Sequence, residues 1–172
     1  WGVLDFAGGT VVHMSAGWAA LAGALILKKR VEPKNDPARI TYVILGTSML
    51  WCGWFGFNAG SALGSSTLAI QAFANTTIAS AAAAIAWGFI EKIQRRKISG
   101  MGVCIGAVVG LVAITPACGF VTISHSMFIG IVASGVSSFM VHLRSKTEID
   151  DTLDVFPCHG VGGIVGMLLT GV

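Results

Sequence analysis

Six stretches of apolar residues alternate with short polar connections along the chain. The stretches cover residues 7–27, 40–62, 68–90, 101–120, 125–143 and 155–172. Each is close to the about 20 residues that an α-helix needs to cross roughly 30 Å of hydrocarbon. Polarity inside them is confined to small hydroxyls, glycines and a few ionisable side chains. The pattern predicts an all-α, polytopic membrane helix bundle with about six spanning helices.

The basic residues fall into three of the five connections between these stretches. They are Lys28, Lys29, Arg30, Lys34 and Arg39, then Lys92, Arg95, Arg96 and Lys97, and finally Arg144 and Lys146. The connections at residues 63–67 and 121–124 contain none. Because cytoplasmic loops of membrane proteins are enriched in Lys and Arg, the three basic connections are predicted to be cytoplasmic. The first helix then runs from outside to inside.

Composition supports the membrane class and excludes others. Hydrophobic residues make up 54% of the chain and charged residues 11%, with a mean hydropathy of +0.79. A soluble domain has about 25% charged residues. The sequence has no basic patch with interleaved aromatic residues, so it gives no support to nucleic-acid binding. The four cysteines contain no CxxC pair, which gives little support to a zinc or disulfide framework. We expect no enzymatic activity and no cofactor.

Both ends of the chain have the character of cut ends. It starts at Trp1 without a basic leader segment and stops at Val172 within an apolar stretch. We therefore expect residues 1–172 to be a single transmembrane fragment of a longer polytopic protein.

The first apolar stretch carries an Asp and a His, which lie eight residues apart. Asp5 precedes Gly8 and Gly9 at the expected helix start. Its carboxylate can accept hydrogen bonds from free N–H groups there, or it can attract a cation to the outer mouth, and both roles are compatible. His13 lies about 12 Å further along the axis, inside the hydrocarbon. An ionisable residue at that depth is a functional-site candidate.

A second candidate histidine, His159, begins the last apolar stretch, where it follows Asp154. The first and last helices each carry an Asp and a His with nearby glycines and enter the membrane from opposite faces. Helices related by an inverted repeat are arranged in this way. Two buried, neutral imidazoles can share a proton, bind a small polar molecule and relay a proton. His125 and His142 lie near helix ends and are expected to be interfacial.

The second stretch has a polar and aromatic outer end. Trp54, Phe57 and Ser61 recur at spacings of three and four, with Asn58 beside them. This cluster is either an interfacial aromatic belt or a mouth that recruits a cation through aromatic faces and a serine oxygen.

The fourth stretch contains Pro116, which removes a helix hydrogen bond. We expect a kink there, with Thr115 available to satisfy a freed carbonyl.

Four motifs together resemble the ammonium transporter family, the Amt/Mep/Rh superfamily. They are LDFAGGTVVHMSAG at 4–17, LWCGWFGFNAGSAL at 50–63, GAVVGLVAITPACGF at 106–120 and LDVFPCHGVGGIVG at 153–166. DFAGG and GWFGFNAGSA are similar to the Amt branch. The resemblance implies the last helix of a first five-helix repeat followed by most of a second repeat, in a homotrimer with one pore per subunit.

The resemblance also implies roles for individual residues. His13 and His159 resemble the twin histidines of a hydrophobic pore, and Asp5 the acidic residue near its outer binding site. Ser61 is similar to the serine of that site, and Phe57 to one of two gate phenylalanines. The expected activity is recruitment and deprotonation of ammonium outside, followed by conduction of ammonia.

Further expectations concern the setting of the protein. The resemblance implies a multi-pass protein of the plasma or inner membrane, with ammonium as substrate and a possible cytosolic regulatory partner. Pro157 stands where many family members have glycine, and pairing of the histidines requires Asp154 to be recessed into a cytoplasmic vestibule. Two alternatives stay open: an ammonium sensor on the same scaffold, and a metal or haem site that uses His13, His159 and Cys158.

Overall fold

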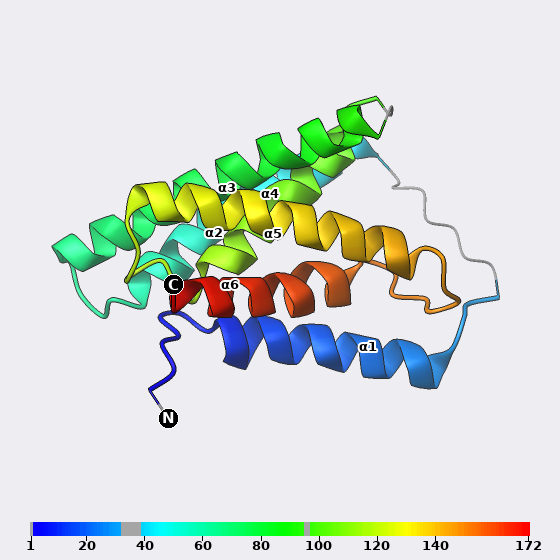
Figure 1. Ribbon diagram of the computed structural model, residues 1–172, viewed down its shortest axis with the longest axis horizontal. Helices are drawn as coiled ribbons and strands as arrows, with labels where there is room; N and C mark the ends of the chain where they lie inside the picture. The colour runs from blue at the N-terminus through cyan, green and yellow to red at the C-terminus, as the bar shows by residue number, and fades with distance from the viewer. Residues whose placement is uncertain (1, 32–38, 95–96) are drawn as a thin grey trace.

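The computed structural model describes residues 2–31, 39–94 and 97–172, and the described chain is helical throughout its regular segments (Figure 1). Lys34, Arg95 and Arg96, three of the predicted loop cations, lie outside these ranges. The helices are α1 (Ser15–Leu27), α2 (Ile40–Gly60), α3 (Thr67–Ile93), α4 (Gly100–Ile114), α5 (Ile123–Arg144) and α6 (Gly162–Thr170). Two π-helical turns, η1 (Gly9–Met14) and η2 (Phe156–Val161), lead into α1 and α6.

Four of these helical segments are long and apolar enough to span a membrane. They are Gly9–Leu27, Ile40–Gly60, Thr67–Ile93 and Ile123–Arg144. Gly100–Ile114 and Phe156–Thr170 are apolar but shorter. The prediction of an all-α membrane protein is confirmed, and each of the six predicted stretches contains a helix.

The fourth predicted stretch ends earlier than expected. We predicted a kinked helix to residue 120, but α4 ends at Ile114 and the chain turns through 115–120. Pro116 has no N–H to continue the helical ladder. Thr115 does satisfy a freed carbonyl as expected, since its hydroxyl donates to the carbonyl of Leu111 at 2.8 Å. Pro116 therefore terminates the helix rather than bending it.

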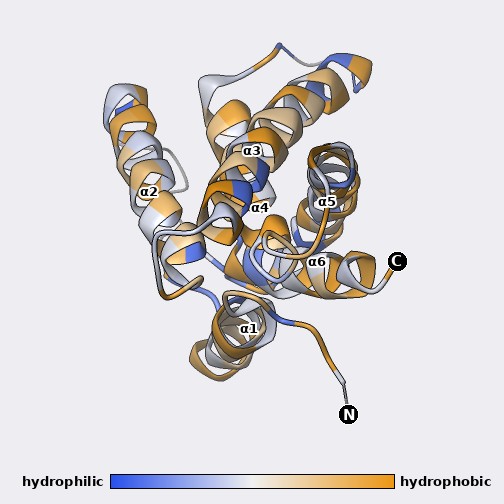
Figure 2. Cartoon of the chain, turned by 90° about the vertical axis from the view of Figure 1, so that its left-hand side faces the viewer, coloured by the Kyte–Doolittle hydropathy of each residue, from blue (hydrophilic) through white to orange (hydrophobic). Residues whose placement is uncertain are grey.

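Helix α4 occupies the centre of the bundle, with the other helices arranged around it (Figure 2). Small residues make this possible, because a Cβ at Gly110 would lie only 2.6 Å from the carbonyl oxygen of Ala79 on α3. Close approach through glycine is the usual packing of membrane helices. The peripheral helices expose large apolar side chains such as Leu25, Ile70 and Phe89.

The continuous helices η1–α1 and η2–α6 lie side by side and antiparallel, so that α1 packs against η2 and α6 against η1 (Figure 1). The described parts of the three basic connections gather at one end of the bundle, at the right of Figure 1. The connections at 61–66 and 115–122 lie at the opposite end. This separation agrees with the alternation that the sequence predicts.

Candidate pore site

The Asp5 carboxylate caps the start of η1. Its Oδ1 accepts hydrogen bonds from the N–H groups of Gly8 at 3.0 Å and Gly9 at 2.6 Å, and its Oδ2 accepts from Thr10 at 2.9 Å. Gly8 has a φ of 110°, in the region that favours glycine, and this conformation turns the chain toward the carboxylate. Asp5 therefore fixes the direction in which the helix bearing His13 enters the bundle.

Asp151 performs the same task at the other end of the bundle. It is buried, and its carboxylate accepts hydrogen bonds from the N–H groups of Val155 at 3.0 Å and Phe156 at 2.7 Å, at the start of η2. Asp151 precedes His159 by eight residues, just as Asp5 precedes His13. Asp151 is not among the site residues predicted from the sequence, although the repeated spacing of eight residues is a signal that identifies it.

Asp154, which the sequence predicts to pair with His159, has a different partner. Its Oδ1 accepts a hydrogen bond from Nε of Arg144 at 2.8 Å and forms an ion pair with Nη2 at 2.5 Å. Burial raises the pKa of the Asp154 carboxyl, and the positive charge of Arg144 opposes this rise. Asp151, and not Asp154, therefore caps the helix start before His159 as Asp5 does before His13. This corrects the prediction that Asp154 pairs with His159.

A close helix contact brings the two histidine-bearing segments together. A Cβ at Gly17 of α1 would lie 2.2 Å from the Cα of Gly160 in η2, so the backbones touch. Pro157 is fully buried in the first turn of η2, where a missing N–H breaks no helical hydrogen bond. Pro157 thus leaves the start of this helix intact.

His13 and His159 face each other within the bundle. Their ring centroids are 5.5 Å apart, with planes inclined at 47°. His13 is only 4% exposed, and His159 is half-buried. By contrast, His125 and His142 are exposed on α5, as expected for interfacial residues.

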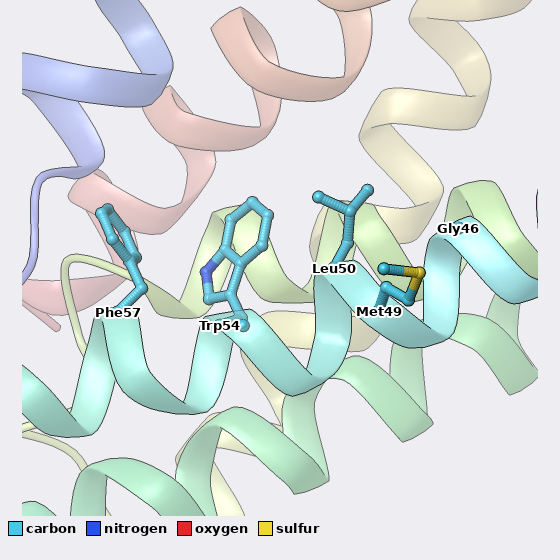
Figure 3. Close-up of a pocket in the computed structure, with 6 residues that line it drawn as sticks. Gly46, Met49, Leu50, Trp54 and Phe57 are labelled. Carbon is cyan, nitrogen blue, oxygen red and sulfur yellow. The ribbon is translucent and has the colours of Figure 1, made fainter.

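Two aromatic side chains of α2 complete the surroundings of His13. Trp54 stacks on the imidazole with centroids 5.1 Å apart and planes at 18°. Phe57 lies 5.9 Å from the same ring. Figure 3 shows both side chains on one side of α2, where they line an apolar hollow of about 490 Å³ with Gly46, Met49, Leu50 and Gly53.

Thr115 joins this cluster from the end of α4. Its Oγ1 lies 3.1 Å from Nε2 of His13 and accepts a hydrogen bond from Nε1 of Trp54 at 3.0 Å. From the sequence, Thr115 is expected only to satisfy a backbone carbonyl. The three side chains come from distant parts of the chain, so no local pattern indicates their contact.

The remaining predicted mouth residues point elsewhere. Asn58 is fully buried and donates from Nδ2 to Oγ1 of Thr76 at 3.0 Å, which ties α2 to α3. Ser61 donates its hydroxyl to the carbonyl of Phe57 at 2.8 Å. Of the predicted face, Trp54 and Phe57 reach His13, whereas Asn58 and Ser61 bond elsewhere.

The metal alternative gains no support from the geometry. Within residues 2–31, 39–94 and 97–172, no three His, Cys, Asp or Glu side chains are grouped as metal ligands. Nε2 of His13 is also engaged with Thr115.

Comparisons with known proteins agree with the architecture. Residues 1–172 match the Ammonium Transporter Family. An ammonium transporter of Aquifex aeolicus is 55% identical over 172 residues, which cover 99% of this chain and 41% of that protein. The crystal structure of Saccharomyces cerevisiae Mep2 superimposes with a TM-score of 0.93 at 41% identity, covering 99% of this chain and 39% of that one. The chain spans about two-fifths of the length of these relatives.

A further solved structure bears on the sensor alternative. It carries the name Sensor Amt Protein and superimposes with a TM-score of 0.90 at 34% identity. The match covers 97% of this chain and 44% of that one.

Proposed function

This chain belongs to the ammonium transporter family, and on that premise we propose that it forms part of a path that carries ammonium or ammonia across a cell membrane. The observation that carries the proposal is the contact between His13 and His159, whose ring centroids are 5.5 Å apart. Two imidazoles in an apolar bundle provide hydrogen-bonding atoms for a small polar molecule. They provide no fixed negative charge that would hold a hydrated cation.

The chemistry of the surroundings favours conduction of the neutral molecule. His13 is enclosed by Trp54 and Phe57, and the adjoining hollow on α2 is apolar. Carrying a full charge through such a region is costly. In the proposed mechanism ammonium loses its water and its proton near Phe57. Ammonia then passes the two histidines by exchanging hydrogen bonds, and the rings can relay the proton separately.

Recruitment at the outer mouth belongs to the same proposal. Trp54 and Phe57 offer aromatic faces that attract a cation. The Asp5 carboxylate contributes a negative charge near the start of the same helix that bears His13, although three backbone N–H groups already bind it. In this proposal Asp5 orients η1, which bears His13, and its negative charge attracts a cation to the outer mouth.

The proposed setting extends beyond this chain. We propose a homotrimer in the plasma or inner membrane, with the three basic connections in the cytoplasm, where a regulatory protein has access to them. In this arrangement α1 is the last helix of a first repeat, and α2 to α6 form most of a second. The matching turns η1 and η2, each carrying a histidine and each capped by an Asp eight residues earlier, support this assignment.

Uptake of radiolabelled methylammonium by proteoliposomes that contain the full-length protein tests the proposal. We expect saturable uptake that ammonium inhibits, above that of protein-free vesicles. Uptake no faster than in protein-free vesicles would contradict it. Sensing is the second candidate function, because a structure named Sensor Amt Protein shares the fold. Specific ammonium binding without uptake would favour that candidate.

A further inference from the structure

The hydroxyl of Thr115 lies between three polar groups and cannot serve all of them in the same way. It contacts Nε1 of Trp54, Nε2 of His13 and the carbonyl oxygen of Leu111 at 3.0, 3.1 and 2.8 Å. A hydroxyl has one hydrogen to donate and two lone pairs that accept. The indole N–H of Trp54 can only donate, and a carbonyl can only accept. The single hydrogen of Thr115 therefore goes either to Leu111 or to His13.

The end of helix α4 decides between these two acceptors. In a continuing helix the carbonyl of Leu111 would accept from the N–H of Thr115, but that N–H bonds to the carbonyl of Val112 at 3.2 Å. Pro116, the next residue, has no N–H. Leu111 is fully buried, so water does not replace the missing donor. The hydroxyl hydrogen of Thr115 is thus required by Leu111.

With that hydrogen committed, Thr115 presents only lone pairs to its neighbours. One accepts the indole N–H of Trp54, and the other faces His13. All three contacts are satisfied when Nε2 of His13 carries a proton. If Thr115 instead donated its hydrogen to Nε2 of His13, the buried carbonyl of Leu111 would be left without a donor. A buried acceptor without a hydrogen bond costs free energy, so this arrangement is disfavoured.

We propose that Thr115 is a positioning residue that holds His13 in the neutral tautomer with its proton on Nε2. Nδ1 of His13 then carries the lone pair and acts only as an acceptor. Stacking on Trp54 holds the ring plane, while Thr115 sets which ring edge donates. In any hydrogen bond that joins the two rings through Nδ1 of His13, His159 is the donor. The pair thereby has a fixed polarity.

This inference concerns the site of the proposed function, and its consequence for transport rests on that function. An ammonia molecule that reaches Nδ1 of His13 binds by donating an N–H. A proton taken up by His13 itself is likewise accepted at this atom. Thr115, although it lies just after α4 and outside the two histidine-bearing helices, would set the direction of both steps.

Nitrogen NMR of the full-length protein with ¹⁵N-labelled histidine tests the assignment directly, because protonated and unprotonated ring nitrogens have distinct shifts. His13→Asn identifies the His13 signals by their loss. In the wild type we expect a protonated Nε2 and an unprotonated Nδ1. Thr115→Ser keeps the hydroxyl and should keep this pattern. Thr115→Val, which has nearly the same shape without the hydroxyl, should give a mixture of tautomers or the Nδ1–H form.

A wild-type His13 protonated on Nδ1 would overturn the proposal, as would Thr115→Val with an unchanged Nε2–H pattern. If Thr115→Val does not accumulate, the wild-type measurement and Thr115→Ser still decide. Because NMR reports the tautomer without any transport measurement, a wrong tautomer proposal is distinguishable from a wrong proposed function. The uptake rate of Thr115→Ser should stay within about twofold of the wild-type rate. The uptake rate of Thr115→Val should fall about tenfold or more, because an incorrect histidine tautomer strongly lowers activity in enzymes that depend on one tautomer.

Discussion

Trp54 lies nearly parallel to the imidazole of His13, with ring centroids 5.1 Å apart and an interplanar angle of 18°. The indole also donates from Nε1 to Thr115, which in turn contacts the edge of His13. Trp54 therefore holds the histidine both through its face and through a shared hydroxyl. An interfacial belt residue would be expected to reach polar surroundings, whereas Trp54 is only 9% exposed.

Replacing Trp54 separates these two contributions. Trp54→Phe keeps an aromatic face but removes the N–H donor, and it should lower the free energy of unfolding by about 1 kcal/mol. Trp54→Leu removes both and should cost about 2–3 kcal/mol. We also expect a larger loss of methylammonium uptake for Trp54→Leu. Thermal unfolding in detergent and uptake in vesicles measure both effects, and equal losses in the two variants would contradict the stacking role.

The contact between Gly17 and Gly160 predicts a sharp size limit. Gly17→Ala places a Cβ 2.2 Å from the Cα of Gly160, so α1 and η2 must separate. We expect a destabilisation of about 1–3 kcal/mol and a marked fall in uptake, because the separation also moves the histidines apart. Gly23→Ala on the same helix is the matched control, since a Cβ there meets nothing within 4 Å. Similar melting temperatures for the two variants would argue against the contact.

The two capping carboxylates predict that Asp151 matters as Asp5 does. Asp151→Asn and Asp5→Asn each weaken charge-assisted hydrogen bonds to a helix start, at an expected cost of about 2 kcal/mol. Both should also reduce uptake, because each cap directs a helix that bears a histidine. Asp154→Asn should leave the orientation of His159 largely unchanged. Melting curves and uptake of the three variants provide the comparison, and greater sensitivity at Asp154 than at Asp151 would refute the assignment.

The ion pair between Arg30 and Asp150 predicts acid sensitivity at the basic end of the bundle. The backbone N–H, Nε and Nη2 of Arg30 bind the carboxylate at 3.0, 2.6 and 2.8 Å. Hydrogen bonds from the Arg30 guanidinium and then its backbone N–H lower the pKa of Asp150 to about 2, from about 3.9 in an unfolded chain.

Because the folded-state pKa is depressed, the ion pair contributes its full stability above about pH 4 and loses it as the pH falls through about 2. The difference in melting temperature between wild type and Asp150→Asn should therefore be largest above about pH 4 and shrink toward pH 2. Melting curves at several pH values measure this difference. A gap that stays constant over this range would show that Asp150 does not titrate as described.

Much of the fold follows from the sequence because a bilayer imposes one length and one polarity pattern on every spanning helix. The same reasoning failed at Pro116, where a helix that was expected to bend instead ends. The pattern of apolar residues predicts which segments are helical. It does not show whether backbone carbonyls that lose a hydrogen bond near a proline are satisfied by other donors. In this chain Thr115 supplies one, and the helix can stop.

The site was predictable only where chemistry was unusual for its surroundings. His13 and His159 stand out because imidazoles are rare inside apolar segments. Asp151 does not stand out, because Asp154 lies nearer to the start of the helix and is the more obvious candidate. The spacing of eight residues between Asp151 and His159 was nevertheless present in the sequence. The contact of Thr115 with His13 depends on packing between distant helices, and no single-sequence pattern records that contact.

We propose that His13 and His159 line the path of ammonium or ammonia. Methylammonium uptake by the full-length protein with His13→Ala or His159→Ala tests this most directly. Both variants should be compared with His142→Ala, an exposed histidine on α5 that serves as the control. We expect each variant at His13 or His159 to lose uptake or to change its selectivity against other monovalent cations, while the control matches the wild type. Wild-type uptake and selectivity in both histidine variants would contradict this proposal.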